Sequence, residues 1–114
     1  MNVNNQWTQV LNHLEQHLGE KPDFDGILFF IGLQELGFVP EKLNKNQKLD
    51  VMHVAICTLL SNYGYYMYKG NDEEGWPHWE KTNDLPLLKP LEQERLIKEA
   101  IIGYFIADLQ QPSL

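Results

Sequence analysis

The sequence predicts a mainly α-helical protein: a four-helix bundle-like single domain with a short β-hairpin or an ordered aromatic loop between the third and fourth helices. Two observations lead to this prediction. In four separate segments, apolar residues recur three and four positions apart, the spacing that places them on one face of a helix. Residues 65–89, between the last two of these segments, lack that spacing and are rich in aromatic and turn-forming residues.

The first helix is predicted over about residues 4–18. Gly19 is placed to end it, because glycine adopts the left-handed conformation of a helix C-terminus without steric cost. The expected inward stripe is Trp7, Val10, Leu11, Leu14 and Leu18. With 114 residues and 43% hydrophobic content, the chain has room for one core, so residues 1–114 are expected to form one domain.

The second helix is predicted from Asp23, a good N-cap, to Gly37. Its apolar residues cover nearly the full circumference: Phe24, Ile27, Leu28, Phe29, Phe30, Ile31, Leu33 and Leu36. A helix that is apolar all round is either central to a bundle or has a second face at a subunit interface.

A third helix is predicted over about residues 46–63, with Gly64 as its cap, and a fourth helix begins after Pro90. The third should bury Leu49, Met52, Ile56, Leu59, Leu60 and Tyr63, and the fourth Leu91, Ile97, Ala100, Ile101, Tyr104 and Phe105. Pro77 would confine any second strand of the hairpin to a sheet edge.

Charge and composition exclude several classes of function. The net charge is −7, Arg95 is the only arginine, and the only basic cluster is Lys42, Lys45 and Lys48. Because nucleic acids and anionic membranes are bound through Lys and Arg, we expect neither partner. No signal peptide and no apolar run of bilayer length are visible, and Cys57 is the only cysteine, so we expect a cytoplasmic protein.

Glu35 and His53 are the first candidates for a site, because each falls on an apolar stripe. Helical spacing predicts burial of His53 and a partly buried Glu35, and a buried carboxylate needs a partner such as His53. We interpret the pair as a structural lock. The alternatives are an acid–base couple, two ligands of a metal, or a Glu35 that reaches solvent. Cys57 lies one turn after His53, and we expect it to be buried and inert.

Metal-binding spacing is present but incomplete. His13 and His17 are four residues apart, and Asp50 precedes His53 by three. Di-iron bundles use two such carboxylate–histidine pairs with two further carboxylates, all facing inward. A solvated helix face explains His13 and His17 better, so no metal site and no cofactor are predicted.

The aromatic segment between Tyr63 and Trp79 holds the remaining candidate binding residues: Tyr66, Tyr68, Trp76, His78 and Trp79. Rigid aromatic rings beside a few polar groups are typical of recognition surfaces. They are equally what a short loop needs to fix itself over a small core. Both interpretations stay open.

Phe24-Asp-Gly-Ile-Leu-Phe-Phe-Ile-Gly-Leu-Gln-Glu-Leu-Gly37, Gly64-Tyr-Tyr and Gly75-Trp-Pro-His-Trp79 resemble stretches of a small family of bacterial proteins of similar length that have no known activity. The resemblance covers much of the chain. It implies a bacterial, cytosolic protein, and it brings no activity and no site residues.

The sequence thus predicts a non-enzymatic protein-interaction module, homodimeric, that uses the apolar helix 24–36 or the aromatic loop 65–79. The alternative is a small-molecule-binding or catalytic domain centred on Glu35 and His53 beneath residues 76–79. These hypotheses differ in one geometric respect, namely whether Glu35 and His53 converge on a pocket that is open to solvent.

Overall fold

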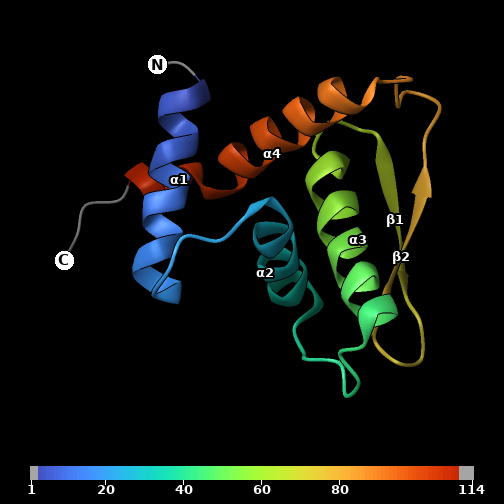
Figure 1. Cartoon of the computed structure of the whole chain (residues 1–114). Helices are drawn as coiled ribbons and strands as arrows, with labels where there is room; N and C mark the ends of the chain where they lie inside the picture. Colours follow the sequence, from blue (N-terminus) through green and yellow to red (C-terminus); the bar gives the residue numbers. More distant parts are fainter. Residues whose placement is uncertain (1–2, 111–114) are drawn as a thin grey trace. The chain divides into compact units, whose positions relative to one another are not determined.

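The computed structural model describes residues 3–110 of the backbone and the side chains of residues 4–106. Most of the chain is helical, with four helices and one antiparallel hairpin among the described residues, as predicted (Figure 1). The elements in chain order are α1 (Val3–Leu18), α2 (Phe24–Leu36), α3 (Lys45–Ser61), β1 (Tyr66–Asn71), β2 (Pro77–Lys81) and α4 (Pro90–Gln110). They divide into two compact units, α1 with α4 and residues 24–87.

The helix ends follow local sequence signals. Gly19, Gly37 and Gly64 have φ values of 85°, 82° and 79°, the left-handed conformation predicted for helix-ending glycines. At the start of α3, the side chain of Asn44 accepts a hydrogen bond from the Gln47 N–H at 2.9 Å. Pro90 is the first residue of α4, as expected of a residue without an N–H donor.

In the first unit, α1 packs against α4. The predicted stripes are confirmed at their centres, where these side chains are buried: Val10, Leu14, Ile97, Ala100, Ile101 and Phe105. They are wrong at their ends, because Leu18 is 43% exposed and Leu91 is 80% exposed. Both residues lie in terminal turns, where the apolar spacing of the sequence extends beyond the buried part of the helix.

In the second unit, α2 packs closely against α3, with Gly32 at the point of contact. A Cβ atom on Gly32 would lie 2.0 Å from the carbonyl oxygen of Val51, so only glycine fits between the two backbones. The buried residues of the two helices are Ile27, Leu28, Ile31, Gly32, Leu36, Val51, Val54, Ala55, Cys57, Leu59 and Leu60.

The predicted inward stripe of α3 is only partly right. Leu59 and Leu60 are buried, whereas Leu49 is 53% exposed and Tyr63 is 42% exposed. His53, predicted to be buried, is exposed. The physical reason is that α3 contacts both α2 and β1, so its burial does not follow a single helical stripe.

The hairpin pairs Tyr66 with Lys81 and Tyr68 with Trp79. The register then shifts so that Asn71 lies opposite Pro77, which leaves one extra residue in β1. Gly70, with φ of 102°, lies within this irregularity. β1 packs against α3 (Figure 1).

Candidate functional site

The turn of the hairpin is organised by Asp72. One carboxylate oxygen accepts hydrogen bonds from the backbone N–H groups of Glu74 at 2.9 Å and Trp76 at 3.0 Å. The other lies 2.9 Å from Nε2 of His78. The hydrogen bond from His78, followed by that from the Trp76 N–H, holds the pKa of Asp72 below its ordinary value. Asp72 therefore fixes the residues that lead into β2.

The same turn is anchored to the segment after α2. The rings of Phe38 and Trp76 meet edge to face, with centroids 5.9 Å apart. Gly75 lies directly beside Phe38, because a Cβ atom there would be 3.3 Å from the Phe38 ring. These contacts position the hairpin turn relative to the C-terminal end of α2.

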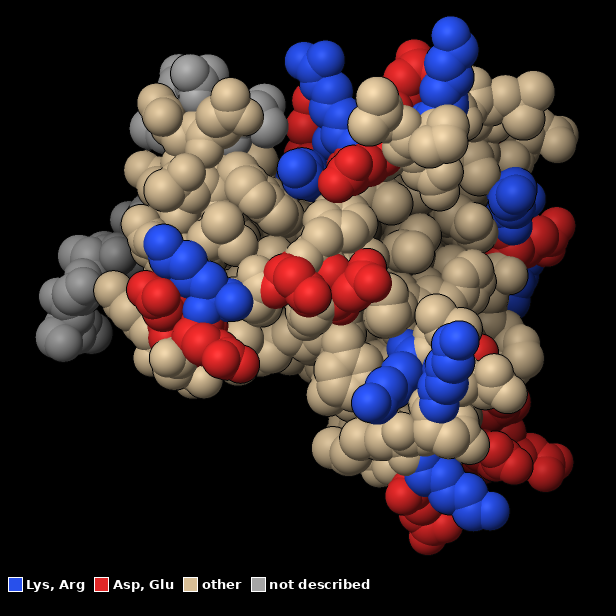
Figure 2. Space-filling model, viewed as in Figure 1, with Lys and Arg blue, Asp and Glu red and all other residues tan. Residues whose placement is uncertain are grey.

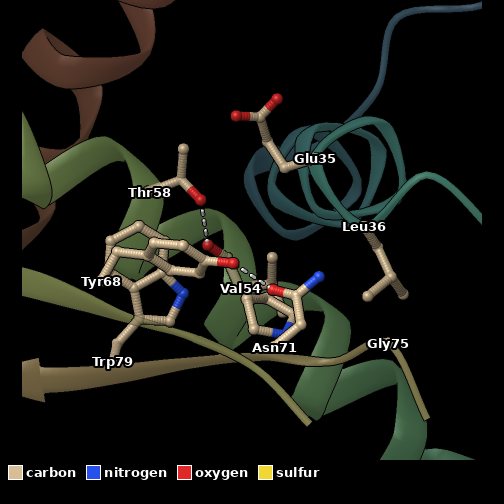
Figure 3. A pocket seen from close by; sticks show the side chains of 9 residues that line it. Glu35, Leu36, Val54, Thr58, Tyr68, Asn71, Gly75 and Trp79 are labelled. Atoms are coloured by element: carbon tan, nitrogen blue, oxygen red, sulfur yellow. Dashed lines mark hydrogen bonds between the residues drawn. The ribbon is translucent and has the colours of Figure 1, made fainter. Parts of the chain in front are cut away.

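A pocket of about 360 Å³ lies between the hairpin, α3 and the last turn of α2 (Figure 3). Its lining side chains come from all of these elements and from the hairpin turn: Glu35, Leu36, Val54, Thr58, Tyr68, Asn71, Gly75, Pro77 and Trp79. The volume is in the lower part of the range typical of small-ligand sites. Glu35 projects from α2 at the rim of the pocket (Figure 3).

Two aromatic rings form one wall of this pocket. The ring of Tyr68 is tilted by 57° against that of Trp79, with centroids 5.4 Å apart. The Tyr68 hydroxyl donates a hydrogen bond to the side-chain oxygen of Asn71, and the Thr58 hydroxyl donates one to the Val54 carbonyl at 2.8 Å (Figure 3). The Tyr68 ring is thereby held in place on the hairpin.

The indole nitrogen of Trp79 is the polar atom without a partner at this site. It is buried and makes no hydrogen bond. In Figure 3 it lies on the edge of the ring that is turned toward the other lining side chains. Buried indole N–H groups usually donate a hydrogen bond. Because this nitrogen exposes almost no surface, a ligand in the pocket reaches the donor only if the neighbouring side chains shift.

His53, Cys57 and Tyr66 form a second cluster, and none of the three lines the pocket. The Sγ atom of Cys57 lies 3.4 Å from Nε2 of His53, whose ring meets Tyr66 edge to face at 6.4 Å. Cys57 is buried, as predicted, and burial raises its pKa to about 11. The pKa of Tyr66 is also raised, first by burial and then by the charge of Cys57. At neutral pH the thiol is therefore protonated and a poor nucleophile.

Glu35 lies at the pocket, but it is exposed and not partly buried as predicted. Leu36, the next residue, takes the buried position in the last turn of α2. The observed arrangement is the alternative in which Glu35 reaches solvent near the helix end. His53 is also exposed and lies in the other cluster, so Glu35 and His53 do not both line this pocket.

The pocket brings together three of the predicted binding residues, Glu35, Tyr68 and Trp79. Trp76 and His78 lie next to it, at the Asp72 turn and the start of β2. Sequence reasoning missed Asn71 and Thr58, which meet the other lining residues only in the folded chain. The turn at Asp72 could be predicted from the sequence, because an Asp followed by a Gly three residues later is a common turn pattern.

The histidine pairs do not extend to a metal site in the part of the chain that the structure describes. The rings of His13 and His17 lie 4.7 Å apart, centroid to centroid, and the His13 ring also lies 6.1 Å from that of Phe105. No group of three or more His, Cys, Asp and Glu side chains among residues 4–106 is placed to hold a metal ion.

On the face drawn in Figure 2, Lys and Arg side chains lie among Asp and Glu side chains and form no broad basic area. No helix within residues 3–110 is long and apolar enough to cross a membrane.

Comparisons with protein-family models, curated proteins and solved structures found no match. The chain's own geometry is therefore the basis for a functional proposal.

Proposed function

We propose that the protein is a non-enzymatic interaction module whose recognition site is the pocket beneath the aromatic hairpin. One observation carries the proposal: the fold gathers Glu35, Tyr68 and Trp79 around a single pocket of about 360 Å³. Aromatic side chains next to a few polar groups are the usual composition of recognition sites.

The hairpin supports this role better than the apolar helix α2. In β1, Met67 is 54% exposed and Tyr68 is 52% exposed. In α2, every apolar side chain is buried or half-buried: Phe24, Ile27, Leu28, Phe29, Phe30, Ile31, Leu33 and Leu36. Because binding energy comes from surface that a partner removes from water, the hairpin has more to contribute.

The proposed partner is a second copy of the chain, which makes the module a homodimer. The support is that β1 and β2 form a two-stranded sheet, so each strand has an edge at which another strand can add. A bacterial source and a cytoplasmic location belong to the same proposal. The resemblance to a family of bacterial proteins supports the first, and the single buried cysteine supports the second.

A small-molecule-binding domain is the second candidate, favoured by the buried, unpaired N–H of Trp79 at the same pocket. Its catalytic form has less support, because neither His53 nor Cys57 lines the pocket. The acid–base hypothesis needs the imidazole of His53 at this pocket, and that imidazole lies beside Cys57 and Tyr66.

Sedimentation velocity at micromolar concentrations tests the interaction module. We expect the wild-type chain to form a dimer and Tyr68→Ser to shift it toward monomer. The matched control is Tyr63→Ser, which removes a tyrosine that is 42% exposed and does not line the pocket. A wild-type chain that stays monomeric, or a Tyr68→Ser variant that associates as well as the control, would contradict the proposal.

A further inference from the structure

We infer that the pocket beneath the hairpin binds a methylated ammonium group, carried by a small molecule or by a modified lysine side chain. This inference rests on the proposed function, since it concerns the same pocket, and it goes beyond it: the methylated ammonium occupies the pocket itself, whereas the second copy of the chain adds at a strand edge of the hairpin. It combines three properties of the pocket: its aromatic wall, its charge and the state of its hydrogen-bonding groups.

The aromatic wall provides the first reason. Tyr68 and Trp79 present two rings tilted by 57° to one another at one site. The negative face of an aromatic ring attracts a cation within about 6 Å of its centroid, and quaternary ammonium groups are commonly recognised in this way.

The charge of the lining side chains provides the second reason. Glu35 is the only ionisable acid or base among the nine lining residues apart from the Tyr68 phenol, and none is Lys, Arg or His. The chain as a whole carries −7. A carboxylate at the rim of a pocket in an acidic protein favours a cation and disfavours phosphate or carboxylate ligands.

The hydrogen-bonding groups distinguish a methylated ammonium from a primary one. A primary ammonium carries three donors, each of which needs an acceptor when it is desolvated. In the pocket, the Asn71 side-chain oxygen and the Val54 carbonyl each already accept one hydrogen bond, from Tyr68 and Thr58, so the three donors of a primary ammonium would compete for these oxygens and for the Glu35 carboxylate at the rim. A quaternary ammonium has no N–H group and makes no such demand.

The N–H of Trp79 adds one requirement to the ligand. Because this donor is buried and unpaired, a ligand gains if the neighbouring side chains shift and let its acceptor oxygen reach the N–H. The preferred ligand is therefore compact, with a methylated ammonium group and a hydroxyl or carbonyl oxygen a few bonds away. Choline and a peptide that contains trimethyl-lysine both meet this description.

Titration followed by NMR of the tryptophan indole N–H groups tests the inference. The chain has three tryptophans, so the Trp79 signal can be assigned with a Trp79→Phe variant. The probes are choline and its neutral isostere, in which a tert-butyl group replaces trimethylammonium. We expect choline to shift the Trp79 signal and to bind at least about tenfold more tightly than the isostere. A parallel titration with the trimethyl-lysine peptide and its unmethylated form distinguishes a side-chain source from a free ligand.

Two variants connect binding to the pocket. Glu35→Gln should weaken choline binding by about fivefold, the upper range for one exposed charge pair. Glu41→Gln is the matched control, because it removes the same charge from an exposed residue that does not line the pocket. Tyr68→Leu should weaken binding by about three- to tenfold.

The outcomes separate this inference from the proposed function. Equal binding of choline and its isostere would overturn the inference and leave the pocket as a recognition site for neutral groups. Absence of any shift with choline and with the methylated peptide would also overturn it. In either case the sedimentation result for Tyr68→Ser decides the proposed function independently.

Discussion

Asp72 and Cys57 show how differently single residues are held in this chain. Asp72 is at the surface, yet its carboxylate receives hydrogen bonds from two backbone N–H groups and faces His78. Cys57 has none of its surface exposed, and its thiol lies beside the imidazole of His53. The first residue is stabilised as an anion and the second as a neutral thiol, so their titrations affect the fold in opposite pH ranges.

Cys57 is expected to resist alkylation in the native state. Because its pKa rises from 9.0 to about 11, the thiolate fraction at mildly alkaline pH falls by about a hundredfold. The measurement is the rate of iodoacetamide modification by mass spectrometry, native against urea-unfolded. A native rate equal to the unfolded rate would show that the thiol is accessible and ionised.

The same thiol makes a stability contribution that depends on alkaline pH. The pKa of Cys57 is higher in the folded chain, so the unfolded chain loses this proton at a lower pH. The contribution of the thiol to the free energy of unfolding is therefore complete below about pH 9 and is lost as the pH rises toward about 11. Replacing the thiol by Cys57→Ala should remove this part of the alkaline loss. Urea unfolding across that range, wild type against variant, measures the difference.

Asp72 is expected to act in the opposite direction. Its pKa is lowered, so its contribution to stability is present above the unfolded value of 3.8 and is lost as the pH falls through the lower folded value.

Asp72→Ala should expose the amides of Glu74 and Trp76 to rapid hydrogen exchange at neutral pH. Glu73→Ala, a neighbouring change outside this hydrogen-bond set, should leave their exchange unchanged. Equal exchange in the two variants would show that Asp72 does not organise the turn.

At the scale of elements, local signals in the sequence were enough for the ends of helices and for a hairpin or ordered loop between α3 and α4. Gly19 and Gly37 end α1 and α2 where their conformational freedom predicted it, and the tyrosine-rich residues 65–68 overlap the start of β1. Burial along α3 was less predictable. A helix that contacts a second helix on one side and a strand on another does not bury one stripe, so His53 was misplaced.

The close contact of α2 with α3 leads to a prediction about stability. Gly32→Ala should destabilise the protein by about 2–4 kcal/mol, because the new Cβ would collide with the backbone of Val51 and the helices would have to separate. Gly103→Ala is the matched control within α4. No atom lies within 4 Å of its new Cβ, so it should be neutral or stabilise by up to about 1 kcal/mol. Urea unfolding of both variants measures the two effects, and a tolerated Gly32→Ala would refute the close approach.

At the scale of the whole molecule, the sequence indicated which residue types were candidates but not which of them meet. Glu35 and Tyr68 are far apart along the chain, and only the packing of α2 and the hairpin with α3 brings them to one pocket. The same packing places His53 with Cys57 and Tyr66 instead of Glu35. Helical spacing describes one element at a time and carries no information about the partner that each face meets.

The hairpin is the proposed interaction element of the molecule, and hydrogen–deuterium exchange at high and low protein concentration tests this most directly. We expect association to slow the exchange of backbone amides in β1 and β2, with little change in α2. Slowing that is confined to α2, or exchange that is independent of concentration throughout the hairpin, would contradict the account.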